Sequence, residues 1–357
     1  MPLPPLQFEP ILKPRAWGGN RLRHFGKPVA EDATPPIGES WEIADLAPPV
    51  RGGVCRVRGG PFSGTMLDDL MRHHQKALLG KAQPTREGRF PLLIKYLDAA
   101  QNLSVQVHPT PAYVRAHRDT HVKNEAWVVL DAAPGACVYR GVQEGVGAAE
   151  FRRAVAAGIV TSVLIRLPVR TGDCVPLRSG VCHALGAGVT AAEVQSPGDT
   201  TFRIFDWNRN DPERPLHIEE AMECILFGNQ QELDTPPISN LADSPALWSD
   251  GLRADTLCSG ESFEIEAIEA SPAGDAAPLP MITNDLPVVG MLVRGEACME
   301  TEGGQRAYLR AGDTVLFPAQ LVPTQVALSP EALLLRATLP PPGIGFLDPR
   351  PRKERLA

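Results

Sequence analysis

Three features that would classify a chain at once are missing from this sequence of 357 residues. None of its seven cysteines forms a CxxC pair and their number is odd, so we expect buried thiols in a reducing compartment rather than a disulfide framework. No apolar run approaches the roughly 18 residues of a membrane span, and "MPLPPLQFEPIL" lacks the basic and apolar regions of a leader peptide. We therefore expect a soluble, cytoplasmic protein that does not associate with membranes.

An excess of positive charge is also missing. Lys and Arg number 35 against 42 Asp and Glu, which gives a formal net charge of −7 at pH 7. An acidic surface repels phosphodiester backbones, so no nucleic acid partner is expected. A small anionic substrate stays compatible with this charge, because a local group of Arg and Lys can override the global field.

Proline and glycine, in contrast, are abundant, with 36 and 32 residues scattered between short apolar runs. This pattern is typical of many short strands joined by turns, and it predicts a mainly β protein. Helical spacing of apolar residues predicts one clear helix over 63–81, capped by Ser63 or Thr65, and shorter helices over 110–119, 149–158 and 216–228. The turn-rich stretch 231–248 marks the expected domain boundary.

An internal echo indicates two halves of similar fold. "GDCVPLRSGVCH" begins at Gly172 and "GDTVLFPAQLVP" begins at Gly312, an offset of 140 residues. His183 of the first copy falls on Pro323 of the second, so only the first half would keep polar ligands. We expect a catalytic domain over 1–235, which includes the helix at about 63–81, and a degenerate copy over 236–357.

The stretch "LSVQVHP", residues 103–109, carries polar side chains where a buried strand would be apolar. Alternation along a strand places Ser104, Gln106 and His108 on one face. By the same rule "VKNEAWVVL" places Lys123, Glu125 and Trp127 together, and His183 follows a glycine turn in "SGVCHAL". One wall could thus display a carboxamide, a carboxylate and two imidazoles.

These donors suit Zn²⁺ or another first-row divalent ion, and three or four protein ligands leave room for water or substrate. One carboxylate leaves about one net positive charge on the ion, which strengthens it as a Lewis acid. A lone strand histidine is more often structural, and a KxE pair is usually a solvated face. The combination of two polar pairs with a further histidine favours the metal site over those explanations.

A second patch of charged residues lies in "AAEVQSPGDTTFRIFDWNRN", residues 191–210. An arginine such as Arg203 on a strand beside a metal site can hold an anion, since its planar fork suits phosphate oxygens. Asp–Arg pairs on a surface turn would give the same pattern.

Taken in order, these motifs resemble those of type I mannose-6-phosphate isomerases, particularly the short bacterial form. The resemblance rests on "FPLLIKYLDAAQNLSVQVHP", "KNEAWVVL", "GDCVPLRSGVCHAL" and "EVQSPGDTTFRIFDWNR", with "PRAWGGNRL" and "IGESWEIA" near the N-terminus. It implies tandem cupin (β jelly-roll) domains with a small helical insertion, the second cupin being degenerate. It also implies one zinc ion per chain, held by Gln106, His108, Glu125 and His183.

The resemblance further implies roles beyond the metal. Lys123, Arg203 and Asp199 match catalytic positions of the family, and we expect Lys123, Arg203, Trp17 and Ser104 to contact the substrate. The catalytic base stays open among Asp199, Lys123, a ligand-linked histidine and a bound water. Likewise, the sequence leaves the oligomeric state open.

The implied reaction is the interconversion of mannose 6-phosphate and fructose 6-phosphate through an enediolate. Departures from the family pattern at Thr110, Pro111, Val128 and Arg178 leave the preferred sugar open. The alternatives are a cupin isomerase of another sugar, a non-catalytic cupin that binds a sugar phosphate, and a metal-dependent oxygenase.

Overall fold

The computed structural model describes residues 2–48, 50, 52–117, 119–198, 200–209, 211–212, 214–228, 238–245 and 247–341. The chain divides into two compact units. The unit that we name the first barrel comprises Pro10–Cys55 and Leu92–Asp243. The other, which we name the second barrel, comprises Met1–Glu9, Arg56–Pro91 and Ser244–Ala357.

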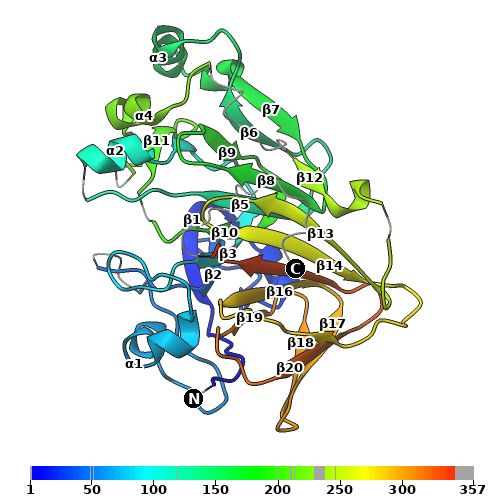
Figure 1. Cartoon of the computed structure of the whole chain (residues 1–357). Helices are drawn as coiled ribbons and strands as arrows, with labels where there is room; N and C mark the ends of the chain where they lie inside the picture. Colours follow the sequence, from blue (N-terminus) through cyan, green and yellow to red (C-terminus); the bar gives the residue numbers. More distant parts are fainter. Residues whose placement is uncertain are drawn as a thin grey trace. The chain divides into compact units, whose positions relative to one another are not determined.

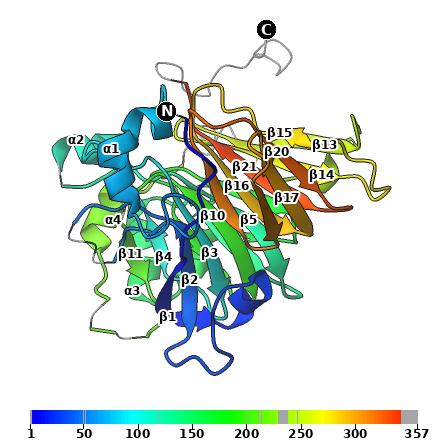
Figure 2. The same cartoon turned by 90° about the horizontal axis from the view of Figure 1, so that it is seen from below.

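The first barrel consists of two antiparallel sheets. Its larger sheet has the order β1 (Ile11–Gly19), β2 (Ile37–Ile43), β3 (Leu93–Ala99), β10 (Val189–Gln195), β5 (Glu125–Ala132), β8 (Asp173–Leu177) and β12 (Ser239–Asn240). Strands β2, β3, β10 and β5 lie side by side in Figure 2. The smaller sheet has the order β11 (Phe202–Phe205), β4 (Val105–Val107), β9 (His183–Leu185), β6 (Cys137–Val142) and β7 (Leu164–Pro168). This is a cupin-type jelly roll, as the sequence predicted.

The second barrel also has two antiparallel sheets. One has the order β13 (Leu252–Ser259), β14 (Glu264–Ala270), β21 (Leu333–Thr338), β16 (Val288–Arg294) and β19 (Thr314–Phe317). The other has the order β15 (Leu279–Pro280), β20 (Thr324–Leu328), β17 (Glu296–Thr301) and β18 (Arg306–Arg310).

The strand orders of the two barrels correspond. The run β2-β3-β10-β5-β8 of the first barrel has the same connectivity as β13-β14-β21-β16-β19 of the second. The two copies of the sequence echo lie on β8 and β19, which take equivalent places, and both turn glycines, Gly172 and Gly312, adopt a positive φ. The tandem arrangement is therefore confirmed.

Four α-helices are described: α1 (Leu67–Leu79), α2 (Pro111–Ala116), α3 (Ala148–Ala156) and α4 (Ile218–Cys224). Each lies where helical spacing predicted it, and α4 lies beside β11 (Figure 1). Short 3₁₀ helices cover Arg21–Phe25, Val160–Val163 and Leu241–Asp243.

Two details of these helices differ from expectation. The residue that precedes α1 is Met66, which makes no side-chain cap, so the expected cap at Ser63 or Thr65 is wrong. Helix α1 also belongs to the second barrel rather than to the catalytic unit. The expected boundary at 235–236 lies outside the described residues and stays a prediction.

The interior of the first barrel is apolar in part and polar in part. Val105 and Val107 of β4 pack into a hydrophobic cluster, while Ser104 and His108 of the alternate face are also buried.

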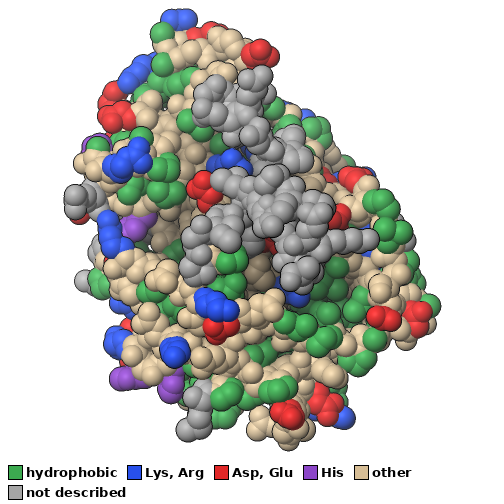
Figure 3. Space-filling model, viewed as in Figure 1, with side chains coloured by type: hydrophobic (Ala, Val, Ile, Leu, Met, Phe, Trp, Pro, Cys, Tyr) green, Lys and Arg blue, Asp and Glu red, His purple; other side chains and the backbone are tan. Residues whose placement is uncertain are grey.

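Six of the seven cysteines are buried and Cys298 is half-buried. On the face drawn in Figure 3, acidic and basic side chains are interspersed among the described residues. In the described part of the chain, no helix is long and apolar enough to cross a membrane.

Candidate metal centre

The expected ligands come from both sheets of the first barrel and meet inside it. Gln106 of β4 pairs in register with His183 of β9, and His108 follows β4 directly. Glu125 begins β5 in the larger sheet, and its Oε1 lies 3.1 Å from His183 Nε2. Its Oε2 lies 3.3 Å from His108 Nε2, and all three side chains are fully buried. Of the described residues, these form the one group of three His, Cys, Asp or Glu side chains that could hold a metal ion.

The outer nitrogens of the two histidines fix their tautomers. His183 Nδ1 lies 2.8 Å from the carbonyl oxygen of Val181, and His108 Nδ1 lies 3.2 Å from that of Thr200. A carbonyl oxygen can only accept, so each Nδ1 carries a proton. This leaves Nε2 as the atom of each ring that can bind a cation on the side of Glu125. Burial, and next the nearby ammonium of Lys123, lower the pKa of His108 to about 3, so that this ring is neutral near pH 7.

This arrangement fits a bound cation. The unprotonated Nε2 of His108 faces a carboxylate oxygen at 3.3 Å and repels it unless positive charge lies between them, and His183 Nε2 lies 3.1 Å from the other oxygen. Within the described structure, neither His108 Nε2 nor either oxygen of Glu125 makes a well-aligned hydrogen bond, although Oε2 also forms an ion pair with Lys123. The carboxamide of Gln106 reaches the same place, with its nitrogen 3.2 Å from His183 Nε2. Two imidazoles, one carboxylate and one carboxamide suit a first-row divalent ion.

Lys123 supplies a fixed positive charge next to these ligands. Its Nζ lies 2.9 Å from Glu125 Oε2, and the side chain is buried. Burial alone would raise the pKa of the Glu125 carboxyl, but the Lys123 ammonium and the two histidines together outweigh burial and hold that pKa well below its usual range. Glu125 is therefore ionised, as a metal ligand must be.

Arg203 belongs to a cluster of charged side chains beside the ligand strand. It pairs in register with Gln106, and its Nε donates to Ser104 Oγ at 3.1 Å. Arg214 donates to the same oxygen at 2.9 Å, and the Ser104 hydroxyl donates to Asp206 Oδ1 at 2.6 Å. The hydroxyl of Ser104 is thus already used as one donor and two acceptors.

Positive charge predominates in this cluster. Arg209 also contacts Asp206, with its guanidinium nitrogen 2.8 Å from Oδ1. Burial, and next the neighbouring guanidinium of Arg214, lower the pKa of Arg203. Because three arginines outnumber the carboxylates of Asp206 and Asp211, the cluster can attract an anion.

Two expected site residues are not placed among these groups. Asp199 lies outside the described residues, so its role stays a prediction. Trp17 is 3% exposed and packs in a hydrophobic cluster that also contains Trp127. Its contact with substrate likewise stays a prediction.

Sequence reasoning missed a polar row that crosses β2, β3 and β10. Lys95 Nζ lies 2.9 Å from Glu193 Oε2 and donates to Gln195 Oε1 at 2.7 Å, while Glu39 Oε2 lies 3.9 Å away. Glu39 also accepts from Trp41 Nε1 at 2.6 Å. The sequence signal for this row was the polar residues within the strand-like segments "IGESWEI" and "LIKYLDA". In the structure the side chains of the row are buried.

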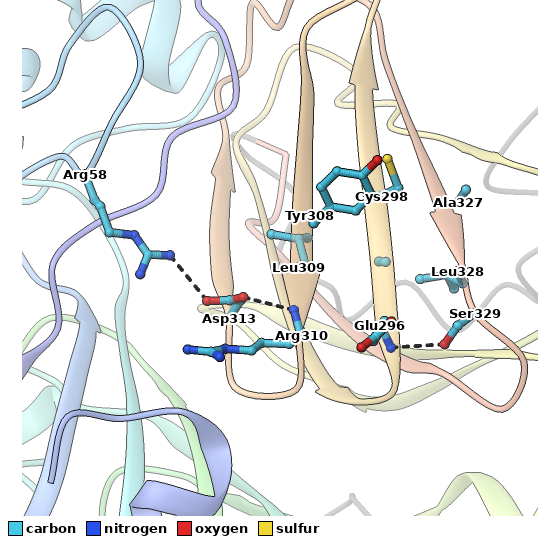
Figure 4. A pocket seen from close by; sticks show the side chains of 11 residues that line it. Arg58, Glu296, Cys298, Tyr308, Leu309, Arg310, Asp313, Ala327, Leu328 and Ser329 are labelled. Atoms are coloured by element: carbon cyan, nitrogen blue, oxygen red, sulfur yellow. Dashed lines mark hydrogen bonds and ion pairs between the residues drawn. The ribbon is translucent and has the colours of Figure 1, made fainter.

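A separate hollow of about 710 Å³ lies on the second barrel, over β17, β18 and β20 (Figure 4). Its charges are largely satisfied, because Arg58 lies 3.3 Å from Asp313 Oδ1 and Asp313 also accepts from the backbone N–H of Arg310. The group that could hold a metal ion belongs to the first barrel, and it is the candidate for the chemistry.

The fold and this site define a class: a tandem cupin enzyme with a buried group of two histidines and one carboxylate that could hold a cation. Comparison with known proteins narrows the class. Residues 6–134 match the family model for the catalytic domain of phosphomannose isomerase type I. The chain is 33% identical over 323 residues to mannose-6-phosphate isomerase of Streptococcus mutans, which covers 88% of this chain and 92% of that one. It therefore belongs to the type I mannose-6-phosphate isomerase family and is an isomerase of that family.

Other relatives agree. A mannose-6-phosphate isomerase of Bacillus subtilis is 36% identical over 225 residues, which covers 62% of this chain and 68% of the relative. The crystal structure of mannose 6-phosphate isomerase from Bacillus subtilis superposes with a TM-score of 0.78 at 24% identity and covers 94% of this chain and 99% of that one. At that identity the superposition supports the fold.

Proposed function

We propose that this chain interconverts mannose 6-phosphate and fructose 6-phosphate with one zinc ion bound per chain. Family membership supports the reaction, and the donor set of the first barrel supports the metal. The observation that carries the proposal is the meeting of two Nε2 atoms and the Glu125 carboxylate at one point without hydrogen bonds between them. A cytoplasmic location belongs to the same proposal.

His108, His183, Glu125 and Gln106 would hold the ion. A Zn²⁺ bound there would act as a Lewis acid and stabilise negative charge that develops on the sugar oxygens during isomerisation. Val181 and Thr200 accept the outer N–H groups of the two histidines, which keeps each Nε2 directed inward.

The remaining residues would bind and orient the open-chain sugar phosphate. Arg203 in its arginine cluster would hold anionic oxygens, either of the phosphate or of the enediolate, and Lys123 would hold oxygens near the ligands. Ser104 orients Arg203 through the hydrogen bond at 3.1 Å. Trp17 would line the pocket.

Isomerisation moves one proton between C2 and C1, so the site needs a general base. Asp199, Lys123, a ligand-linked histidine and a bound water are the candidates.

The test is a metal analysis and a coupled isomerase assay on the same purified sample. We expect about one zinc per chain, loss of activity on chelation, and recovery on addition of Zn²⁺. Mannose 6-phosphate should be turned over in preference to mannose. Full activity in metal-free protein would reject the metal, turnover of mannose alone would reject the phosphate requirement, and oxygen consumption would indicate an oxygenase instead.

A further inference from the structure

Trp127 is a fully buried indole that contacts one of the candidate ligands edge-on. It lies two residues after Glu125 on β5 and is 1% exposed. Its ring meets the ring of His183 at 76°, with centroids 5.5 Å apart. The ring of His183 also lies 4.9 Å from that of His108. His183 thus contacts both a second candidate ligand and the indole, and the indole limits how far the imidazole can tilt.

The orientation of the indole is itself fixed. Trp127 Nε1 donates to Glu193 Oε1 at 2.9 Å. The other oxygen of Glu193 lies 2.9 Å from Lys95 Nζ, and both of these side chains are buried. The acceptor is a buried carboxyl oxygen, so an indole that lost this hydrogen bond would leave that oxygen without its donor.

The second barrel shows what this position looks like where the candidate ligands are absent. Strand registers place Arg336 and Glu266 where the first barrel has Glu193 and Lys95, so an ion pair between a half-buried arginine and a buried glutamate is found there with its charges reversed. The residue in the place of Trp127 is Gly290, which faces Arg336 as Trp127 faces Glu193. The second barrel therefore has an ion pair at this position without a tryptophan. The first barrel, which carries the candidate ligands, has both the ion pair and the tryptophan.

We propose that Trp127 is a positioning residue for the metal centre. Held by the Glu193–Lys95 pair, its indole fixes the ring of His183 so that Nε2 points at the bound ion. This inference rests on the proposed function, because it takes the metal site as real. Burial alone would make Trp127 a core-packing residue, whereas the inference gives it the further role of orienting His183.

Trp41 provides a matched control for the test. It lies on β2 of the same sheet, is 4% exposed, and its Nε1 donates to the buried carboxylate of Glu39 at 2.6 Å. Trp41→Phe and Trp127→Phe each remove one indole N–H and the same volume, yet only Trp127 contacts a candidate ligand. Metal affinity is measured by competition of Zn²⁺ or Co²⁺ with a chelator, and the visible absorption of the Co²⁺-loaded protein reports ligand geometry.

We expect Trp127→Phe to weaken metal affinity about 10-fold or more and to alter the Co²⁺ spectrum, whereas Trp41→Phe should change neither. Equal affinities and spectra in the two variants overturn the inference and leave the proposed function standing. A wild-type chain that takes up no metal overturns both.

If Trp127→Phe does not fold, Glu193 gives a second comparison. Glu193→Gln keeps an oxygen that can accept from the indole, while Glu193→Ala removes it. Metal affinity should fall in Glu193→Ala and be largely kept in Glu193→Gln. An equal loss in both variants would mean that the charge of Glu193, not the orientation of the indole, controls the metal, and the inference would be wrong.

Discussion

Glu125 of the first barrel and Val288 of the second occupy the same register position in equivalent strands. Glu125 lies opposite Gln195 and Leu177, and Val288 lies opposite Thr338 and Phe317. Leu177 and Phe317 are separated by the same 140 residues as the two copies of the echo. A valine cannot ligate a metal, so the second barrel has lost the carboxylate while it has kept the strand arrangement.

The carboxylate of Glu125 should decide whether the metal is held. In Glu125→Gln the side chain keeps its shape but loses the charge that balances Lys123 and a dication. We expect metal affinity to fall at least about 100-fold and isomerase activity to fall with it. Metal content after gel filtration and coupled-assay rates measure the two effects.

A matched control exists in the same barrel. Glu42 is buried and lies 2.7 Å from Lys27 Nζ, so Glu42→Gln likewise removes one buried carboxylate from a lysine. This variant should lose stability but keep its metal. Full zinc occupancy in Glu125→Gln would contradict the ligand assignment.

Arg203 should matter for substrate and not for metal. Arg203→Ala removes a guanidinium from the cluster at Ser104, and we expect KM for mannose 6-phosphate to rise about 10- to 100-fold, as for loss of a hydrogen bond to a charged group. Zinc content should stay at the wild-type level. Steady-state kinetics and metal analysis measure both, and the exposed Arg166→Ala serves as the control that keeps wild-type kinetics. An unchanged KM in Arg203→Ala would remove Arg203 from the substrate site.

Part of the candidate ligand group could be expected from the sequence, because period-two alternation needs no knowledge of the tertiary structure. Once "SVQVH" is taken as a strand, Gln106 and His108 must share a face. That Glu125 and His183 join them was implied by the family resemblance, and in the structure the four side chains lie together. The tandem fold was readable for a similar reason, since a turn glycine followed by an aspartate and an apolar run marks the same local structure in both halves.

The polar row was not readable, because it depends on which strands are neighbours. Lys95 and Glu193 are 98 residues apart and meet only because β10 lies between β3 and β5. In isolation, a lysine in "LLIKYLD" has the pattern of an edge strand facing solvent. The cap of α1 was missed for a different reason: Ser63 and Thr65 have the right chemistry, but the helix begins only after Met66.

Ser104 should act through the arginines. Its hydroxyl already donates to Asp206 and accepts from Arg203 and Arg214, so no hydrogen is left for a substrate oxygen. Ser104→Ala should raise KM about 5-fold, as for one lost hydrogen bond, with zinc content unchanged. Because the effect passes through Arg203, the same change in an Arg203→Ala background should add little. Additive effects of the two changes on KM would instead indicate that Ser104 contacts the substrate directly.

Glu39 should make the stability of the protein depend on pH in the acid range. Burial opposes its ionisation, but the charges of Lys95 and Arg15 and its hydrogen bonds outweigh burial and lower its pKa to about 2, from a usual value of 4.5. A group whose pKa is lower in the folded state binds more protons when unfolded, so folding stability rises with pH between these two values. The contribution is fully present above about pH 4.5 and is lost as pH falls toward 2. Its size is roughly 3 kcal/mol, at about 1.4 kcal/mol for each pKa unit.

In Glu39→Gln this source of pH dependence is removed. The free energy of unfolding, measured by urea titration between pH 5 and pH 3, should therefore change less steeply with pH than in the wild type. The exposed Glu150→Gln should keep the wild-type slope, because its carboxylate is solvated in both folded and unfolded chains. If Glu39→Gln and wild type showed parallel curves over this range, the buried contacts with Lys95 and Arg15 would not be holding the carboxylate in its ionised form.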